Sequence, residues 1–186
     1  MRLPANTLEH RFSLERTGLG GMKRVAFVML NPSTANDSKN DATLRRCISF
    51  AKREGASSLR VGNLFADRAT KPRALLDLYD DASRPNEAEL ASLGWALEGA
   101  DLVIVGWGAQ TGKLGRLVHE RVDAILEGWL RRIDVLQCLG FTKAREPRHP
   151  LMLPASAPLI PWAWVVNGAV KRMDRQTIDS RAQEAE

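Results

Sequence analysis

Short apolar runs alternate along the chain with stretches of helical spacing. The clearest run, Val25 to Leu30, is a string of β-forming residues that ends at the polar turn 31–34. A continuous run of this kind is typical of a strand that is covered on both faces. Similar runs predict three further strands, so the four core strands comprise residues 25–30, 59–65, 101–107 and 133–139.

The stretches between these runs have the periodicity of amphipathic helices. Leu44, Cys47, Ile48 and Ala51 are spaced i, i+3, i+4 and i+7, and Gly55 follows them as a stop signal. This spacing predicts a helix over residues 41–54. Comparable patterns predict helices at residues 73–78, 85–98 and 114–129.

Strands that alternate with helices favour a parallel sheet with helices on both faces. We therefore predict an α/β fold, a three-layer α/β/α sandwich whose central four-stranded parallel sheet has the order 2-1-3-4. Residues 10–16 alternate between polar and apolar positions and are followed by glycines, which predicts an N-terminal edge hairpin. Residues 1–166 form a single domain in this reading, and residues 167–186 form a charged C-terminal helix or tail.

Composition narrows the class of protein. A chain of 186 residues with 44% hydrophobic residues is long enough to bury one sizeable core. Cys47 and Cys138 lie among apolar neighbours, so we predict that both are buried and that the protein occupies the reducing cytoplasm. No apolar run approaches a membrane span, and we expect no membrane partner. The net charge of +5 suits a polyanionic partner without proving one.

Familiar cofactor motifs are not supported. Gly106, Gly108 and Gly112 follow a strand, but their spacing is G-x-G-x-x-x-G and the strand is the third rather than the first. The three histidines are scattered and have no cysteine at ligand spacing, which argues against a zinc site or an iron–sulfur cluster. We therefore expect no cofactor and no metal.

Unusual polar residues follow the ends of the predicted strands. Taken singly, Asn31 could cap a turn and His149 could be a solvated loop residue. Because parallel strands point their carboxyl ends at one edge of the sheet, we expect these residues to line one cleft. They are Asn31 to Thr34, Asn63, Trp107 with Gly108, and Arg148 with His149 and Pro150.

The motifs at these strand ends resemble those of a known family. M-L-N-P-S-T-A at 29–35, N-L-F-A-D-R-A-T at 63–70, G-W-G at 106–108 and R-H-P-L at 148–151 are similar to motifs of small bacterial and phage proteins of unknown function. The similarity covers about residues 10–162. More distantly, the chain resembles the mismatch-specific branch of the uracil-DNA glycosylase superfamily, in which a proline-containing motif follows strand one and a His-Pro motif follows the last strand.

The glycosylase resemblance implies a uracil-DNA-glycosylase-like domain that flips a damaged or modified base out of DNA and hydrolyses its N-glycosidic bond. It implies that Asn31 positions water and that His149 donates a hydrogen bond to the departing base. Asp37 and Asp41 are near enough in sequence to reach the same pocket. The implied catalytic residues are thus Asn31, His149, Asp37 and Asp41, and the implied base-binding residues are Pro32, Asn63, Phe65 and Trp107.

The same resemblance implies a DNA partner, duplex or single-stranded, bound by a monomer. Basic side chains would contact phosphates, and two apolar side chains would form a wedge that fills the vacated base stack. The basic residues are Arg45, Arg46, Lys143 and Arg148, and the wedge residues are Leu151 and Met152.

The chain also departs from the superfamily pattern. Asn31 supplies no carboxylate in the first motif, so Asn31→Asp would restore one and is expected to raise activity if the pocket geometry is shared. No aromatic residue lies between Asn31 and Phe50, and Leu151 stands where a serine usually follows the second-motif proline. Two other functions therefore stay open: a non-catalytic nucleic-acid or nucleotide binding module, and an enzyme that acts on free modified nucleotides.

Overall fold

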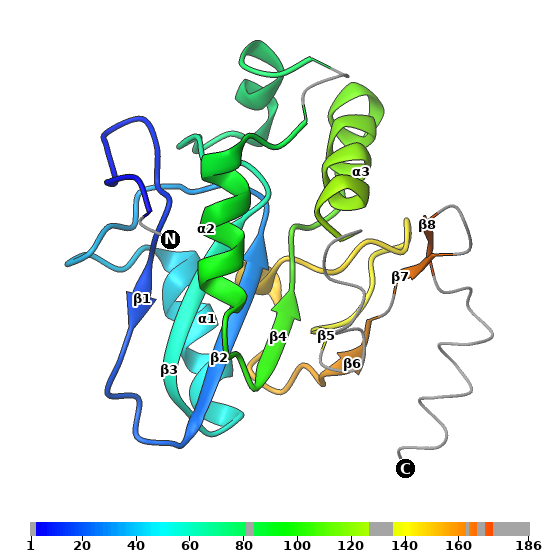
Figure 1. Cartoon of the computed structure of the whole chain (residues 1–186). Helices are drawn as coiled ribbons and strands as arrows, with labels where there is room; N and C mark the ends of the chain where they lie inside the picture. Colours follow the sequence, from blue (N-terminus) through cyan, green and yellow to red (C-terminus); the bar gives the residue numbers. More distant parts are fainter. Residues whose placement is uncertain (1–2, 81–83, 127–135, 163, 167–169, 173–186) are drawn as a thin grey trace.

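The computed structural model describes residues 3–80, 84–126, 136–162, 164–166 and 170–172. Within these residues, six strands form one mixed, mostly parallel sheet in the order β1-β3-β2-β4-β5-β6 (Figure 1). The strands are β1 (Glu15–Arg16), β2 (Lys23–Met29), β3 (Ala56–Asn63), β4 (Leu102–Val105), β5 (Leu136–Cys138) and β6 (Ile160–Pro161). The α/β prediction is confirmed.

The four central strands are parallel. β2 pairs with β3 on one side and with β4 on the other, and β4 pairs with β5. The register places Phe27 of β2 between Val61 of β3 and Ile104 of β4. These pairings have the predicted order 2-1-3-4, and they bring the carboxyl ends of the four strands to the same edge of the sheet.

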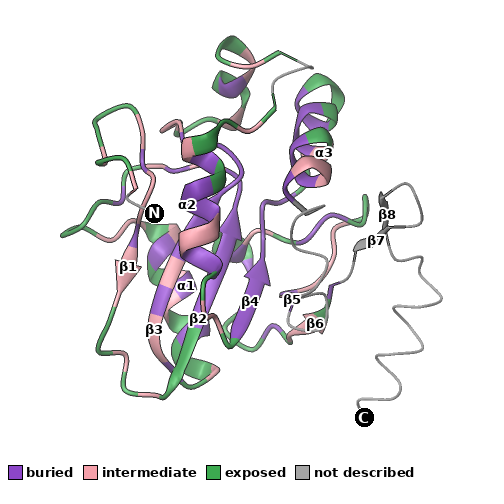
Figure 2. Cartoon of the chain, in the orientation of Figure 1, coloured by how far each residue is buried: buried purple, intermediate pink, exposed green. Residues whose placement is uncertain are grey.

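Helices cover both faces of the sheet. Consecutive residues of a strand point to opposite faces, and accordingly Phe27 packs in one apolar cluster whereas Val28 packs in the other. The Phe27 cluster includes Leu44 and Phe50 of α1 (Ala42–Arg53), and the Val28 cluster includes residues of α2 (Glu87–Leu97) and α3 (Gly112–Leu126). Figure 2 shows β4 and most of β2 buried between these layers.

The predicted helices are found, with one change of type. Asp41 caps α1 by accepting a 2.8 Å hydrogen bond from the backbone N–H of Leu44, and Asn86 and Glu89 form a capping box at the start of α2. The predicted helix 73–78 is the short 3-10 helix η1 (Pro72–Asp77). Residues 127–129 of the last predicted helix and 133–135 of the last predicted strand lie outside the described residues.

The N-terminal edge hairpin is a wrong prediction. β1 pairs antiparallel with β3, not with the next strand β2. The intervening glycine turn packs closely on the start of β3: a Cβ at Gly21 would lie 2.1 Å from the carbonyl oxygen of Gly55. The alternating pattern of β1 indicated a strand, but it carried no information about which strand β1 would join.

Further pairings at the C-terminal end were not predicted. β6 joins the sheet antiparallel to β5, and β7 (Trp164–Val166) pairs with β8 (Val170–Arg172) in a separate two-stranded sheet. Residues 170–172 are thus a strand rather than part of a helix, while the rest of the predicted C-terminal segment, 167–169 and 173–186, lies outside the described residues. Within the described part of the chain, no helix is long and apolar enough to span a membrane.

Candidate functional site

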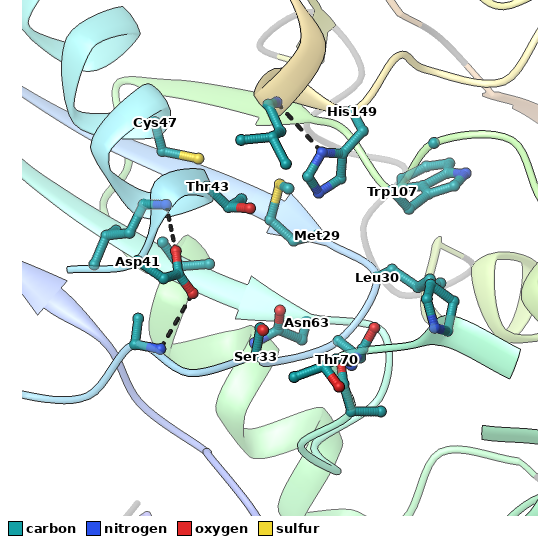
Figure 3. Close-up of a pocket in the computed structure, with 18 of the residues that line it drawn as sticks. Met29, Leu30, Ser33, Asp41, Thr43, Cys47, Asn63, Thr70, Trp107 and His149 are labelled. Atoms are coloured by element: carbon teal, nitrogen blue, oxygen red, sulfur yellow. Dashed lines mark hydrogen bonds between the residues drawn. The ribbon is translucent and has the colours of Figure 1, made fainter. Parts of the chain in front are cut away.

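A cavity of about 520 Å³ lies at the carboxyl ends of the parallel strands (Figure 3). Asn31 follows β2, Asn63 is the last residue of β3, Trp107 follows β4, and His149 lies in the loop after β5. All four side chains line this cavity. The structure thus brings together the four strand-end residues that the sequence placed in one cleft.

The residues that line the cavity differ in exposure, and this difference separates the mouth of the cavity from its inner wall. The lining residues Arg148, Leu151 and Met152 are exposed and border the mouth, whereas Arg11 and Cys47 are almost fully buried. Figure 3 shows Cys47 and Asp41 on the side of the cavity opposite Trp107. A ligand that enters past the exposed residues therefore extends between an aromatic wall and a buried, charged wall.

The G-W-G motif allows the loop after β5 to approach the loop after β4. A Cβ at Gly106 would lie 3.1 Å from Cδ of Pro150, and a Cβ at Gly108 would lie 3.3 Å from Cβ of His149. Gly108 also has a φ of +78°, which disfavours any residue with a side chain. The two glycines therefore hold His149 beside Trp107.

Trp107 is fixed from behind by a buried carboxylate. Its Nε1 donates a 3.0 Å hydrogen bond to Oε2 of Glu146, and Oε1 of Glu146 lies 2.7 Å from Nε2 of His119 on α3. The Trp107 ring also meets Trp162 edge-on, with ring centroids 5.2 Å apart. Sequence reasoning missed Glu146 and His119, because nothing about a single carboxylate in a basic loop marks it as buried.

Asn63 carries a buried amide for which the described residues supply no hydrogen-bond partner. Only 5% of the residue is exposed, and within the described residues its side chain makes no hydrogen bond. A buried polar group left without a partner costs about 1–3 kcal/mol. An amide kept in this state at a cavity wall is available to pair with a ligand.

The Asn31 side chain already makes hydrogen bonds within the protein. Its Nδ2 donates 2.8 Å hydrogen bonds to the carbonyl oxygens of Pro32 and Ala69. Both amide hydrogens are used, so the carbonyl oxygen Oδ1 is the group that Asn31 offers to a ligand. The side chain can accept a hydrogen bond from water, but it cannot donate one to an anion.

His149 can act as a hydrogen-bond donor through its Nε2. Its Nδ1 accepts a 3.3 Å hydrogen bond from the backbone N–H of Leu151. Burial lowers the pKa of His149 below its ordinary value of 6.5, although Asp41 acts in the opposite direction. The ring is therefore neutral at pH 7, and because Nδ1 accepts, the proton resides on Nε2.

Of the two predicted carboxylates, only Asp41 lines the cavity. Its Oδ1 and Oδ2 accept hydrogen bonds from the backbone N–H groups of Leu44 and Ala35, at 2.8 and 3.1 Å. Asp37 is exposed and borders a neighbouring hollow, which shares Ser33, Ala69 and Thr70 with the cavity. The structure does not bring it to the cavity.

Two predicted base-binding residues do not line the cavity. Pro32 is buried, and its carbonyl accepts the hydrogen bond from Asn31. Phe65 is fully buried in the Val28 cluster, where the Arg121 guanidinium lies 4.6 Å from its ring centroid. Phe65 faces α3 rather than the cavity, so it is unavailable to stack on a base. Trp107 packs in the same apolar cluster and is only 2% exposed, but it does line the cavity.

The predicted DNA-binding residues divide into two groups. Arg148, Leu151 and Met152 border the mouth, whereas Arg45, Arg46 and Lys143 do not line the cavity. The guanidinium of Arg46 donates to the carbonyl of Leu153, and Arg46 also lies over the Phe50 ring. Arg46 thus anchors the segment after the short 3-10 helix η3 (Pro150–Met152).

Two arginines outside the predicted set hold the loop after β2. Arg11 donates to the carbonyl of Ala35 at 3.2 Å, and Arg68 donates to the carbonyls of Ser33 and Ala35 at 3.0 and 2.9 Å. Arg11 lines the cavity and is 4% exposed. No sequence signal marked it, because an arginine in an alternating segment is usually solvated.

Among known proteins, the chain matches one family. No curated protein and no solved structure matches the chain. Within the described residues, no group of three or more His, Cys, Asp or Glu could hold a metal ion. A family model described as a protein of unknown function matches residues 11–151, a span that begins at the buried Arg11 and ends at the cavity mouth. The chain therefore belongs to this family of unknown function, DUF1643.

Proposed function

We propose that the cavity binds a nucleobase and that the protein is a DNA glycosylase, which hydrolyses the N-glycosidic bond of a damaged or modified base flipped out of DNA. The observation that carries this proposal is Asn63, whose buried amide has no partner within the described residues. A side-chain amide offers one donor and one acceptor side by side, which is the pattern that a base edge can pair with. The distant resemblance to uracil-DNA glycosylases supports the same reading.

The remaining wall residues suit a planar, partly polar ligand. Trp107, held by its hydrogen bond to Glu146, lines the cavity with the small part of its ring that is not buried, and Met29 and Leu30 add apolar contacts. Water is displaced from such a wall by a base, whose faces are apolar and whose edges are polar. Asn63 pairs with the edge while Trp107 contacts the body of the base.

Three side chains have the chemistry that the reaction requires. In hydrolysis, a water oxygen bonds to C1′ of the sugar while the C1′–N bond breaks and its electron pair stays with the base. Oδ1 of Asn31 accepts a hydrogen bond from the attacking water, and the Asp41 carboxylate accepts the proton that the water releases. Nε2–H of His149 donates to the negative charge on the departing base.

The proposal is tested by mass spectrometry of free bases released from DNAs that carry different modified bases. We expect Asn31→Ala and His149→Ala each to slow single-turnover release by about 100- to 1,000-fold, the usual effect of losing one preorganised group. DNA binding, followed separately by fluorescence anisotropy, should change little. Wild-type rates in both variants would place catalysis elsewhere, and no release by the wild type would favour a binding module.

A second candidate is an enzyme that acts on free modified nucleotides. It is favoured by the internal role of Arg46, whose guanidinium contacts Leu153 instead of lying free for a phosphate. Duplex binding releases counterions and depends steeply on salt, whereas binding of a free nucleotide does not. Base release from free nucleotides with a flat salt response would establish this second function.

A further inference from the structure

Arg11 is buried at the cavity wall with most of its hydrogen-bonding capacity unused. The residue is 4% exposed and lines the cavity, yet within the described residues its side chain makes one hydrogen bond, from Nη1 to the carbonyl of Ala35 at 3.2 Å. Its Nε is buried and has no partner there. A guanidinium has five N–H donors, so burial leaves this one poorly satisfied.

Holding the loop does not account for this burial. Arg68 already donates to the same Ala35 carbonyl at the shorter distance of 2.9 Å, and also to Ser33. The contact of Arg11 therefore duplicates one that a half-exposed arginine makes. Removing a charge from water costs several kcal/mol unless a partner compensates it.

The charges around Arg11 do not compensate it. Burial, followed by repulsion from Arg68, lowers the pKa of Arg11 to about 10, so the group stays cationic at pH 7. Arg16 repels it as well, and Asp41 is the carboxylate that attracts it. Within the described residues, Asp41 forms no ion pair with Arg11, and its oxygens accept hydrogen bonds from backbone N–H groups rather than from the guanidinium.

We propose that Arg11 forms an anion subsite in the inner wall of the cavity, and that the ligand carries a phosphate or carboxylate group that binds its guanidinium. Ser33 and Thr43 also line this cavity and add hydroxyl donors. Thr43 lies in the first turn of α1. The subsite rests on the proposed nucleotide ligand, but it does not depend on cleavage of that ligand.

Two sources could supply the negative charge. One is the phosphate of a free nucleotide, which would enter the cavity whole. The other is an acidic substituent on a base that is flipped from DNA, since the phosphates of a continuous strand stay outside the buried wall. The volume of about 520 Å³ lies within the range of pockets that enclose ligands larger than a bare base.

The experiment is isothermal titration of the full chain at fixed ionic strength with two pairs of probes, each pair consisting of a neutral and a charged member. The probes are the common nucleosides, their 5′-monophosphates, and oligonucleotides that contain cytosine or 5-carboxylcytosine. We expect the charged member of one pair to bind roughly 10- to 100-fold more tightly than its neutral counterpart, as charge-assisted hydrogen bonds do. The pair that shows this preference identifies the source of the charge.

Variants assign the preference to Arg11. Arg11→Met should abolish it and Arg11→Lys should keep part of it. Arg16→Met is the matched control, because Arg16 binds the same loop through Asn36 and Asn40 but does not line the cavity. If Arg11→Met fails to fold, the comparison of charged and neutral probes in the wild type and in Arg11→Lys still tests the subsite.

Equal affinity for the charged and neutral members of both pairs would overturn the subsite. So would a preference that survives in Arg11→Met, or one that Arg16→Met removes as completely. None of these measurements requires base release, so an inactive protein that still prefers the charged probe would refute the catalytic proposal and retain the subsite.

Discussion

Nε1 of Trp107 donates a 3.0 Å hydrogen bond to Oε2 of Glu146, which ties the aromatic wall of the cavity to the loop after β5. The same carboxylate contacts His119 of α3 through its other oxygen, at 2.7 Å. Glu146 is buried, and its backbone also pairs with Thr142 within the loop. The orientation of the proposed base-stacking surface thus depends on a residue that does not line the cavity.

Loss of this carboxylate is expected to release Trp107. We predict that Glu146→Ala lowers the free energy of unfolding by about 1–3 kcal/mol, because it leaves the buried indole N–H without its acceptor. Glu146→Gln keeps one oxygen acceptor and should have a smaller effect. The measurements are thermal unfolding and tryptophan fluorescence. Glu120→Ala, on the exposed side of α3, is the control, and an equal loss there would contradict the prediction.

The two asparagines of the cavity should respond oppositely to the same substitution. We expect Asn63→Leu to leave stability unchanged or to raise it by about 1 kcal/mol, since it removes a buried amide that has no partner among the described residues. Asn31→Leu should lower stability by about 1–3 kcal/mol, because two hydrogen bonds to carbonyls disappear. Asn63→Leu should also weaken nucleotide binding, because Asn63 is the proposed partner of the base edge. Urea unfolding measures the first effect, and marked destabilisation by Asn63→Leu would show that the amide has a structural partner.

The core strands could be predicted because burial on both faces removes polar residues from them, as in the run Val25 to Leu30. Their carboxyl ends share one edge, and this placed Asn31, Asn63, Trp107 and His149 in one cleft. The edge strands β1 and β6 are only two residues long, and their partners are set by tertiary contacts rather than by local pattern.

The burial of charged residues at the site could not be predicted from the sequence, for a different physical reason. A buried charge and a solvated charge look alike in a sequence, so Arg11 and Glu146 carried no signal of their burial. The same ambiguity made Arg46 look like a phosphate contact. Its position on α1 was predicted correctly, but the carbonyl of Leu153, which it contacts, is 107 residues away along the chain.

The structure reverses the expectation for Asn31→Asp. A carboxylate at this position cannot donate, and it would face the carbonyl oxygens of Pro32 and Ala69 at hydrogen-bond distance. We predict a loss of about 2–4 kcal/mol in unfolding free energy and no gain in base release. Asn36→Asp is the matched control, because the Asn36 side-chain oxygen accepts its hydrogen bonds and Asp can replace it. A stable, more active Asn31→Asp would refute this account.

His149 should make stability depend on pH below neutrality. Burial lowers its pKa in the folded state beneath the ordinary value of 6.5. Between these two values the unfolded chain binds a proton that the folded chain does not, so the unfolding free energy falls as the pH drops below about 6.5. The contribution of His149 stops changing once the pH is below the pKa of His149 in the folded state. Unfolding of wild type and His149→Asn from pH 8 to 5 gives the difference, and parallel curves would exclude this contribution.

Arg45 and Arg46 are neighbours on α1 with different expected roles. Arg45 is exposed and donates to the Asn40 carbonyl, whereas the Arg46 guanidinium contacts the carbonyl of Leu153. We predict that Arg46→Met lowers the free energy of unfolding by about 1–2 kcal/mol and leaves the salt dependence of DNA binding unchanged. Arg45→Met should leave stability unchanged and reduce the log–log salt slope by about 0.9, the effect of one lost phosphate contact. Anisotropy of a labelled duplex over a salt series measures the slope.

Two results would contradict this assignment of roles. A slope altered by Arg46→Met, with unfolding unaffected, would place Arg46 in the DNA interface. A slope that neither variant changes would exclude this face of α1 from the DNA interface and favour the free-nucleotide function.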